Sequence, residues 1–256
     1  MRIAIVTGAS SGIGKEFFVS LNNKREEIDE IWVVARNLER LEALSELTDI
    51  KVRPFALDLS DMSSTRVIKA ALEEEKPVIK YMICASGFGR FEAIEDSELA
   101  VLENMVDLNC KSIVSITKIA MDYLDEGSLV MLIASMAAFQ PIPYIAVYGA
   151  TKSFVLSYGR AYNKEISKKG ARCLCVCPFW TNTAFFDRAL SEKQVVKKYA
   201  VMYQPADIVK QAWKDVKNKT KDVSIFGLYA KGQAALVKML PHKLVMSTWL
   251  NQQKLK

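Results

Sequence analysis

The first fourteen residues constrain the fold more than any other part of the 256-residue chain. An apolar run, Ile3-Ala4-Ile5-Val6, leads directly into Thr7-Gly8-Ala9-Ser10-Ser11-Gly12-Ile13-Gly14 and then into a helical pattern. Glycines let the backbone turn sharply and approach a pyrophosphate, which the free amides and partial positive charge of a helix N-terminus attract. The spacing is G-x-x-x-G-x-G and not G-x-G-x-x-G. The turn predicts a dinucleotide-binding strand, loop and helix, and a tight turn without ligand is the alternative.

Short apolar runs alternate with amphipathic stretches along the rest of the chain. This alternation is typical of right-handed βαβ units and of a parallel sheet with helices on both faces. We therefore expect the α/β fold class, with one domain over residues 1–256 and a doubly wound, Rossmann-like parallel sheet of about seven strands. The expected strands are 2–7, 30–35, 51–57, 79–84, 128–134, 171–177 and 222–226. The expected helices are 13–22, 38–47, 62–75, 97–123, 146–168, 205–218 and 230–252.

Two stretches depart from this alternation. Residues 178–204 form a connection of about 27 residues, which is too long for a simple link and predicts a substrate lid. Residues 229–256 are apolar and lysine-rich, and Pro241 interrupts them. We expect this helical tail to cover the substrate, to join a second subunit or to make a peripheral contact with a membrane.

Charge and composition argue against several classes of protein. The formal net charge of +6 suits an anionic ligand, but basic and acidic residues alternate along most of the chain, so no nucleic-acid partner is expected. The opening residues lack the pattern of a signal peptide, and no apolar run approaches the ~18 residues that span a bilayer. A cytoplasmic protein is therefore expected.

Three of the five cysteines, Cys173, Cys175 and Cys177, alternate in one predicted strand, so their side chains are expected on one face. A metal or redox site is one interpretation. Packing in the core is favoured, because free cysteine behaves as a small apolar residue. The single histidine, His242, has no Asp, Cys or second His nearby, so it is expected to cap or solvate a helix. No metal site is predicted.

The end of the second predicted strand indicates which dinucleotide is bound. Folds that prefer NAD usually carry an acid there for the ribose hydroxyls, whereas an arginine accommodates the 2′-phosphate of NADP. In this chain Ala35 ends the strand and Arg36 follows it. We therefore predict NADP(H) as the cofactor, with Ser10 and Asn37 as polar helpers. The alternative is that Arg36 only begins a solvated helix.

Tyr148 and Lys152 are four residues apart in the predicted helix 146–168. Residues at this spacing share one face of a helix, so we expect the ammonium to stabilise the phenolate and to lower the tyrosine pKa from its usual ~10. Ser135 ends the fifth predicted strand, where strand ends in open α/β sheets line the ligand crevice. Its hydroxyl is expected to hold a substrate oxygen for Tyr148.

Taken together, these motifs resemble those of the short-chain dehydrogenase/reductase family, and the resemblance covers nearly all of the chain. The glycine turn matches the family's signature, and Ser135, Tyr148 and Lys152 match its catalytic serine and Tyr-x-x-x-Lys motif. Asn109 falls where the family has a catalytic, helix-kinking asparagine whose carbonyl holds a proton-relay water. The resemblance implies that the cofactor contacts Gly8, Ser10, Ser11, Gly12, Ile13, Gly14, Arg36, Asn37, Asp58, Leu59, Ala85, Ser86, Gly87, Asn109, Tyr148, Lys152, Pro178, Thr181 and Thr183.

Two positions depart from the family pattern. The usual Asn-Asn-Ala-Gly is Cys84-Ala85-Ser86-Gly87 here, so the asparagine side-chain hydrogen bonds are missing, which we expect to cost stability more than activity. The usual Pro-Gly is Pro178-Phe179, and a phenylalanine beside the nicotinamide is expected to reshape the pocket.

The resemblance implies that NADP(H) exchanges hydride with a secondary alcohol or ketone, while Tyr148 transfers the proton and Ser135 binds the oxygen. Aromatic residues in the lid predict a bulky hydrophobic substrate, although packing on the core also explains them. A hydroxysteroid or bile acid is the first expectation, with a role in steroid and lipid metabolism, and a 3-oxoacyl compound or another carbonyl is the alternative. A homodimer or homotetramer is expected. The competing class, a catalytically silent NADP(H)-binding regulator, is disfavoured because both Tyr148 and Lys152 are present.

Overall fold

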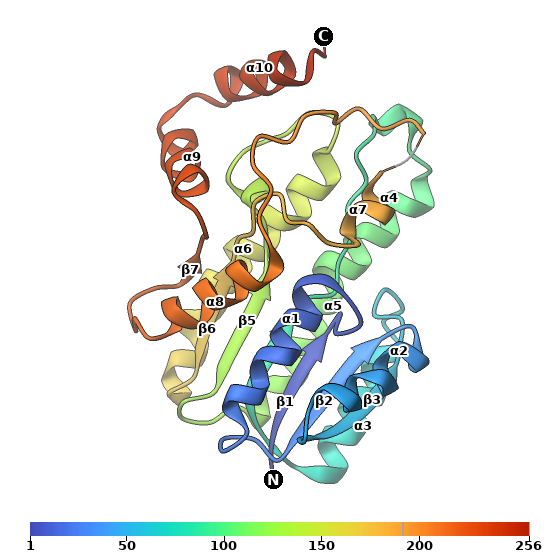
Figure 1. The fold of residues 1–256 in the computed structure, drawn as a ribbon, viewed down its shortest axis with the longest axis vertical. Helices are drawn as coiled ribbons and strands as arrows, with labels where there is room; N and C mark the ends of the chain where they lie inside the picture. The colour runs from blue at the N-terminus through green and yellow to red at the C-terminus, as the bar shows by residue number, and fades with distance from the viewer. Residues whose placement is uncertain (191, 256) are drawn as a thin grey trace.

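Seven parallel strands form one sheet in the order β3-β2-β1-β4-β5-β6-β7 in the computed structural model (Figure 1). The structure describes residues 1–190 and 192–255. The strands are β1 (Arg2–Thr7), β2 (Glu30–Ala35), β3 (Lys51–Ala56), β4 (Val78–Cys84), β5 (Leu129–Ile133), β6 (Arg172–Val176) and β7 (Val223–Ser224). The predicted fold class and all seven predicted strands are confirmed, although β7 has only two residues.

Ten α-helices connect or follow the strands within the described residues. They are α1 (Gly12–Ser20), α2 (Leu38–Glu42), α3 (Ser64–Glu75), α4 (Leu99–Val106), α5 (Ser112–Ala120), α6 (Ala146–Ile166), α7 (Phe185–Ala189), α8 (Pro205–Val216), α9 (Leu228–Met239) and α10 (His242–Gln253).

Helices cover both faces of the sheet, and the side chains of the central strands are therefore buried on both faces. On β1, Ile3 and Ile5 pack in the core under α3, α5 and α6, whereas Ala4 and Val6 pack in the core under α1, α2 and α8 (Figure 1). The three cysteines of the β6 region all lie in the first of these cores with free thiols, so the prediction that they share one face is confirmed.

Three predicted helices differ from the observed ones. The expected helix 38–47 is α-helical only over Leu38–Glu42 and continues as a 3-10 helix over Ala43–Leu47. The expected helix 97–123 is divided into α4 and α5 by one wide turn of π-helix, Asp107–Lys111. The expected helix 230–252 is divided into α9 and α10 at Leu240-Pro241, because proline lacks an N–H and keeps the preceding residue extended. Both breaks lie beside the site described below.

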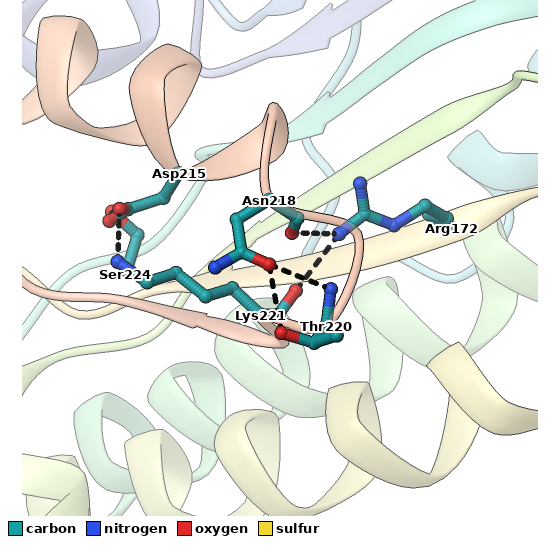
Figure 2. A network of polar contacts seen from close by, with 6 residues as sticks. All are labelled: Arg172, Asp215, Asn218, Thr220, Lys221 and Ser224. Carbon is teal, nitrogen blue, oxygen red and sulfur yellow. Dashed lines mark hydrogen bonds and ion pairs between the residues drawn. The ribbon is translucent and has the colours of Figure 1, made fainter.

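Arg172 on β6 holds the connection between α8 and β7 (Figure 2). Its guanidinium donates to the carbonyls of Val216, Asn218 and Lys221 at 2.6, 3.0 and 3.0 Å. On the other side of the turn, Asp215 accepts from the Ser224 hydroxyl at 2.9 Å and pairs with Lys221 at 2.5 Å. Carbonyls left free at the end of α8 thus find donors, and the short strand β7 is held at the edge of the sheet.

The long connection 178–204 contains one short helix, α7, and lies beyond the carboxyl ends of the strands together with α9 and α10 (Figure 1). Residue 191 of this predicted lid lies outside the described residues. Within the described ranges, no helix combines the length and apolarity required to cross a bilayer, and no group of three or more His, Cys, Asp and Glu residues is arranged to hold a metal ion.

Candidate active site

A cavity of about 930 Å³ opens where the strand order reverses between β1 and β4, at the carboxyl ends of the strands. Such a reversal is where open α/β sheets bind their ligands. The predicted site residues that line the cavity are Gly8, Ser10, Ser11, Gly12, Ile13, Gly14, Arg36, Asn37, Asp58, Leu59, Ala85, Ser86, Gly87, Ser135, Tyr148, Lys152, Pro178, Thr181 and Thr183. The structure therefore brings together segments far apart in the sequence.

The turn between β1 and α1 has the shape that a pyrophosphate requires. A Cβ at Gly14 would lie 2.2 Å from the carbonyl oxygen of Gly8, and a Cβ at Gly8 would lie 2.8 Å from the backbone of Ala85. Gly12 has a φ of +55°, which disfavours any side chain. No acidic residue stands in the first turn of α1, so its amides face the cavity without a competing carboxylate. These residues fit a dinucleotide.

Residues 84–87 form a backbone platform beside the glycine turn. The Thr7 hydroxyl accepts from the N–H of Ala85 at 3.1 Å and of Ser86 at 3.2 Å. These two bonds hold the platform although the family's asparagines are missing. At Gly87, a Cβ would lie 2.9 Å from Asn109 Oδ1 and 3.4 Å from Lys152 Nζ, so glycine is required there.

The far end of the cavity carries charge. Arg36 is exposed at the end of β2, and Asp58 follows β3. Hydrogen bonds from Ser60 and the positive charge of Arg36 hold the pKa of Asp58 below its usual value, although partial burial opposes them as the largest single influence. Asn37 lines the cavity but uses its side chain to cap α2, accepting from the N–H of Arg40 at 2.8 Å. The cap occupies the side-chain oxygen of Asn37, one of the two polar helpers predicted for Arg36.

At the other end of the cavity, Ser135, Tyr148 and Lys152 meet. Ser135 Oγ accepts from the N–H of Ala137 at 3.1 Å and is a hydrogen-bond partner of the Tyr148 hydroxyl. Lys152 is 5% exposed, and its ammonium donates to the carbonyl of Ile133 at 2.8 Å. The same ammonium lies 5.8 Å from the centre of the Tyr148 ring. Serine, tyrosine and lysine therefore surround one point at the end of β5.

Burial dominates the protonation of this group. It raises the pKa of Tyr148 to about 12, against the lowering effect of the Ser135 hydrogen bond. It also lowers the pKa of Lys152 to about 8. The expectation that Lys152 lowers the pKa of Tyr148 is wrong in this structure, because both side chains lose their water and each is driven toward its neutral form. Tyr148 is thus held as a protonated acid.

Asn109 supports the site from behind and does not line the cavity. It is fully buried in the π-helical turn. Its side-chain oxygen accepts from the N–H of Phe88 at 3.1 Å, and its Nδ2 donates to the Phe88 carbonyl at 2.8 Å and to Thr151 Oγ1 at 3.0 Å. The side chain therefore joins the loop after β4 to the helix that carries Tyr148 and Lys152.

Side chains from the connection 178–204 and from the tail line the cavity at its catalytic end. Four of the predicted aromatic lid residues line it: Phe179, Trp180, Phe185 and Phe186. Tyr199 instead packs on Trp180 and Phe186, with ring centres 5.0 and 5.3 Å apart, and Tyr203 packs on Phe226 at 5.1 Å. Some aromatic side chains of this connection thus line the cavity, and others pack within the protein, so each of the two interpretations holds for different residues.

Sequence reasoning missed most of the apolar wall, because its residues stand in segments without a motif. These residues include Ile142, Ile145, Leu228, Leu236, Val237, Leu240 and Val245, and the same wall also contains Phe91 and Trp249. Trp249 Nε1 donates to the carbonyl of Pro143 at 3.0 Å, which fixes α10 to the loop before α6. Of the three roles left open for the tail, covering the substrate end of the cavity agrees with this arrangement.

Comparisons with known proteins agree with this geometry. Glycine betaine reductase ATRR of Emericella nidulans is 32% identical over 218 residues, which are 81% of this chain but only 17% of that protein. The very-long-chain 3-oxoacyl-CoA reductase of Bos taurus is 24% identical over 95% of this chain and 78% of its own length. A solved short-chain dehydrogenase from Sphingobium yanoikuyae, in complex with NADPH, has a TM-score of 0.76 at 22% identity and covers 94% of this chain and 97% of its own.

The family model described as short chain dehydrogenase matches residues 2–194, which include the glycine turn and the Ser135, Tyr148 and Lys152 cluster. The chain therefore belongs to the short-chain dehydrogenase family of oxidoreductases.

Proposed function

We propose that this protein is an NADP(H)-dependent oxidoreductase that interconverts a secondary alcohol and a ketone on a bulky hydrophobic substrate. The observation that carries the proposal is a single cavity with Arg36 at one end and Ser135, Tyr148 and Lys152 at the other. The Sphingobium relative of the same fold was solved with NADPH, which supports this choice of cofactor.

When bound, the nicotinamide would supply or accept the hydride. The chain's own residues hold the substrate and move the proton. Ser135 binds the substrate oxygen as negative charge develops on it, and the Tyr148 hydroxyl, kept protonated by burial, donates its proton to that oxygen in the direction of reduction. Lys152 places a positive charge next to the Tyr148 ring and would hold the ribose hydroxyls of the bound cofactor, and Asn109 keeps its helix in position.

The apolar wall indicates the substrate class. Burial of apolar surface contributes roughly 25 cal/mol per Å², so a fused-ring or long-chain substrate gains several kcal/mol that a sugar does not. A hydroxysteroid or bile acid is our first candidate, because rigid rings suit a cavity framed by Phe91, Ile142 and Trp249. A long-chain 3-oxoacyl compound is the second, because the Bos taurus relative bears the name of a 3-oxoacyl-CoA reductase.

A panel of ketones and alcohols assayed with NADPH and with NADH tests the proposal. It should include steroids, bile acids, 3-oxoacyl thioesters, short hydroxy acids and sugars. We expect NADPH to be preferred and kcat/KM to be highest on the steroids or acyl thioesters. Comparable efficiency on sugars or short hydroxy acids, with none on the bulky compounds, would refute the substrate class, and a preference for NADH would refute the cofactor.

We further propose a peripheral membrane contact through the tail. Leu228 and Met239 of α9 are 88% and 77% exposed, and Leu244 of α10 is 51% exposed. Lys231, Lys238 and Lys243 lie on the same two helices, which suits anionic lipid headgroups. Flotation with anionic vesicles should carry the full chain upward, and exchanging Met239 and Leu244, which do not line the cavity, for Ser should abolish flotation. Equal flotation of both proteins would refute the contact.

A further inference from the structure

Arg188 of helix α7 stands in the cofactor end of the cavity, although no sequence motif points to it. It lines the same cavity as Arg36 and Asp58, but it comes from the lid, whereas those two come from the ends of β2 and β3. The two arginines thus approach one region of the cavity from separate segments of the chain.

The guanidinium of Arg188 is held in place by stacking. Its central carbon lies 4.0 Å from the centre of the Phe88 ring. Both backbone groups of Phe88 are fixed by the buried side chain of Asn109. A guanidinium stacked on an aromatic face keeps its N–H groups free at the edge, so it can still bind an anion with a fork of two donors.

Neither Arg36 nor Arg188 has an ion pair or a side-chain hydrogen bond within the described parts of the chain. Partial burial, and next the positive charge of Arg36, lower the pKa of Arg188. Asp58 acts on both cations but already accepts two hydrogen bonds from Ser60. The cavity lining contains the guanidinium groups of Arg36, Arg40 and Arg188 and the carboxylates of Asp58 and Asp187. The excess of positive charge suits a phosphate.

We propose that Arg188 is a second cation for the adenosine 2′-phosphate of NADP(H), which it binds from the lid while Arg36 binds it from the edge of the sheet. This inference rests on the proposed cofactor. For the pyrophosphate, the amides of the glycine turn are already available. A 2′-phosphate carries nearly two negative charges, so a second guanidinium matches its charge.

Equilibrium binding measured without any substrate tests the proposal. Dissociation constants for NADPH, NADH, adenosine 2′,5′-diphosphate and 5′-AMP are determined by calorimetry for the wild type, Arg188→Gln, Arg36→Gln and the double variant. Arg90→Gln is the matched control, because Arg90 lies close enough to influence Arg188 but does not line the cavity.

We expect Arg188→Gln to weaken NADPH and adenosine 2′,5′-diphosphate by about tenfold to a hundredfold, as for a lost charge-assisted hydrogen bond. NADH and 5′-AMP should bind as before, and Arg90→Gln should change each constant less than about threefold. The double variant should differ from the product of the single effects, because both arginines contact one phosphate.

Equal weakening of NADPH and NADH would place Arg188 at the pyrophosphate and overturn the proposal, and unchanged binding of all four ligands would show that the stack on Phe88 only packs the lid. If Arg188→Gln does not fold, Arg188→Lys keeps the charge without the fork, and its NADPH-selective loss decides in the same way. A wild type that prefers NADH would refute the proposed cofactor itself, and that outcome is visible before any variant is made.

Discussion

The side chain of Gln253 forms two hydrogen bonds with the backbone of Lys198, accepting from its N–H at 3.0 Å and donating to its carbonyl at 3.0 Å. Gln253 Oε1 also accepts from the N–H of Lys197 at 3.0 Å, and the residue is 5% exposed. The last turn of α10 is thereby joined to the connection 178–204, which runs below α10 in Figure 1. Tail and lid form one cover in this arrangement.

Replacing Gln253 with Ala should loosen this cover. Three backbone groups of the lid lose a partner, at about 1–3 kcal/mol for each group that stays buried. We expect faster tryptic cleavage after Lys197 and Lys198, together with a several-fold higher KM for the best bulky substrate. Asn251→Ala, on the exposed side of the same helix, is the control. Identical cleavage rates in the two variants would show that Gln253 does not hold the lid.

Replacing Tyr148 with Phe should remove turnover and leave cofactor binding intact. The ring packs edge-on against Phe91 and beside Phe185, with centres 6.2 and 5.6 Å away, and phenylalanine keeps both contacts. Only the proton donor is lost, so the rate should fall at least about a hundredfold. Tyr158→Phe removes a hydroxyl from the same helix, away from the cavity, and should keep the rate. Turnover above about a hundredth of wild type would exclude Tyr148 as the acid.

Two glycine-to-alanine changes should have opposite effects on stability. At Gly14 the new Cβ would meet the Gly8 carbonyl at 2.2 Å, so the turn must open, at a cost near the upper end of the ~1–3 kcal/mol typical of overpacking. At Gly149, inside α6, the nearest atom is 3.7 Å away, so alanine should stabilise the helix by about 0.5–1 kcal/mol. Urea unfolding of both variants measures the difference. A stable Gly14→Ala variant that still binds NADPH would refute the packing argument.

The sequence predicted the fold well because the signals for it are local. Each strand is a short apolar run. Each motif of the site also lies within a short stretch of sequence: the glycine turn, the serine at the end of β5, and the tyrosine and lysine of α6. The breaks at Asp107–Lys111 and at Leu240 fall at Asn109, where the resemblance implies a kinked helix, and just before Pro241, although the expected helices 97–123 and 230–252 ran through both positions. The first depends on a side chain that bonds across to Phe88, which no local pattern contains.

The walls of the site could not be predicted in the same way. Arg188, Trp249 and Gln253 acquire their positions through contacts with Phe88, Pro143 and Lys198, all far away in the sequence. The protonation of Tyr148 also depends on tertiary structure, since the spacing to Lys152 indicated a lowered pKa and burial reverses it. Motifs therefore located Ser135, Tyr148 and Lys152, whereas much of the cavity wall consists of residues that only the folded chain brings together.

Lys152 should make the protein less stable near neutral pH than a version without the charge. Burial lowers its pKa from 10.5 to about 8, so between these values the unfolded chain binds a proton that the folded protein does not. The free energy of unfolding therefore rises as the pH increases from about 8 to 10.5. Below about pH 8 both states carry the charge, and the full cost of burying the ammonium is present.

Lys152→Met removes this cost together with the hydrogen bond to Ile133. We expect the variant to be inactive yet about 1–3 kcal/mol more stable than wild type at about pH 7, with the gain shrinking toward zero at about pH 10. Urea unfolding of both proteins at the two pH values measures it. Lys69→Met, which removes an exposed lysine paired with Glu73, should leave stability nearly unchanged at either pH. A Lys152→Met variant less stable than wild type at neutral pH would mean that the bond to Ile133 outweighs the buried charge, and that the active site does not carry the instability argued here.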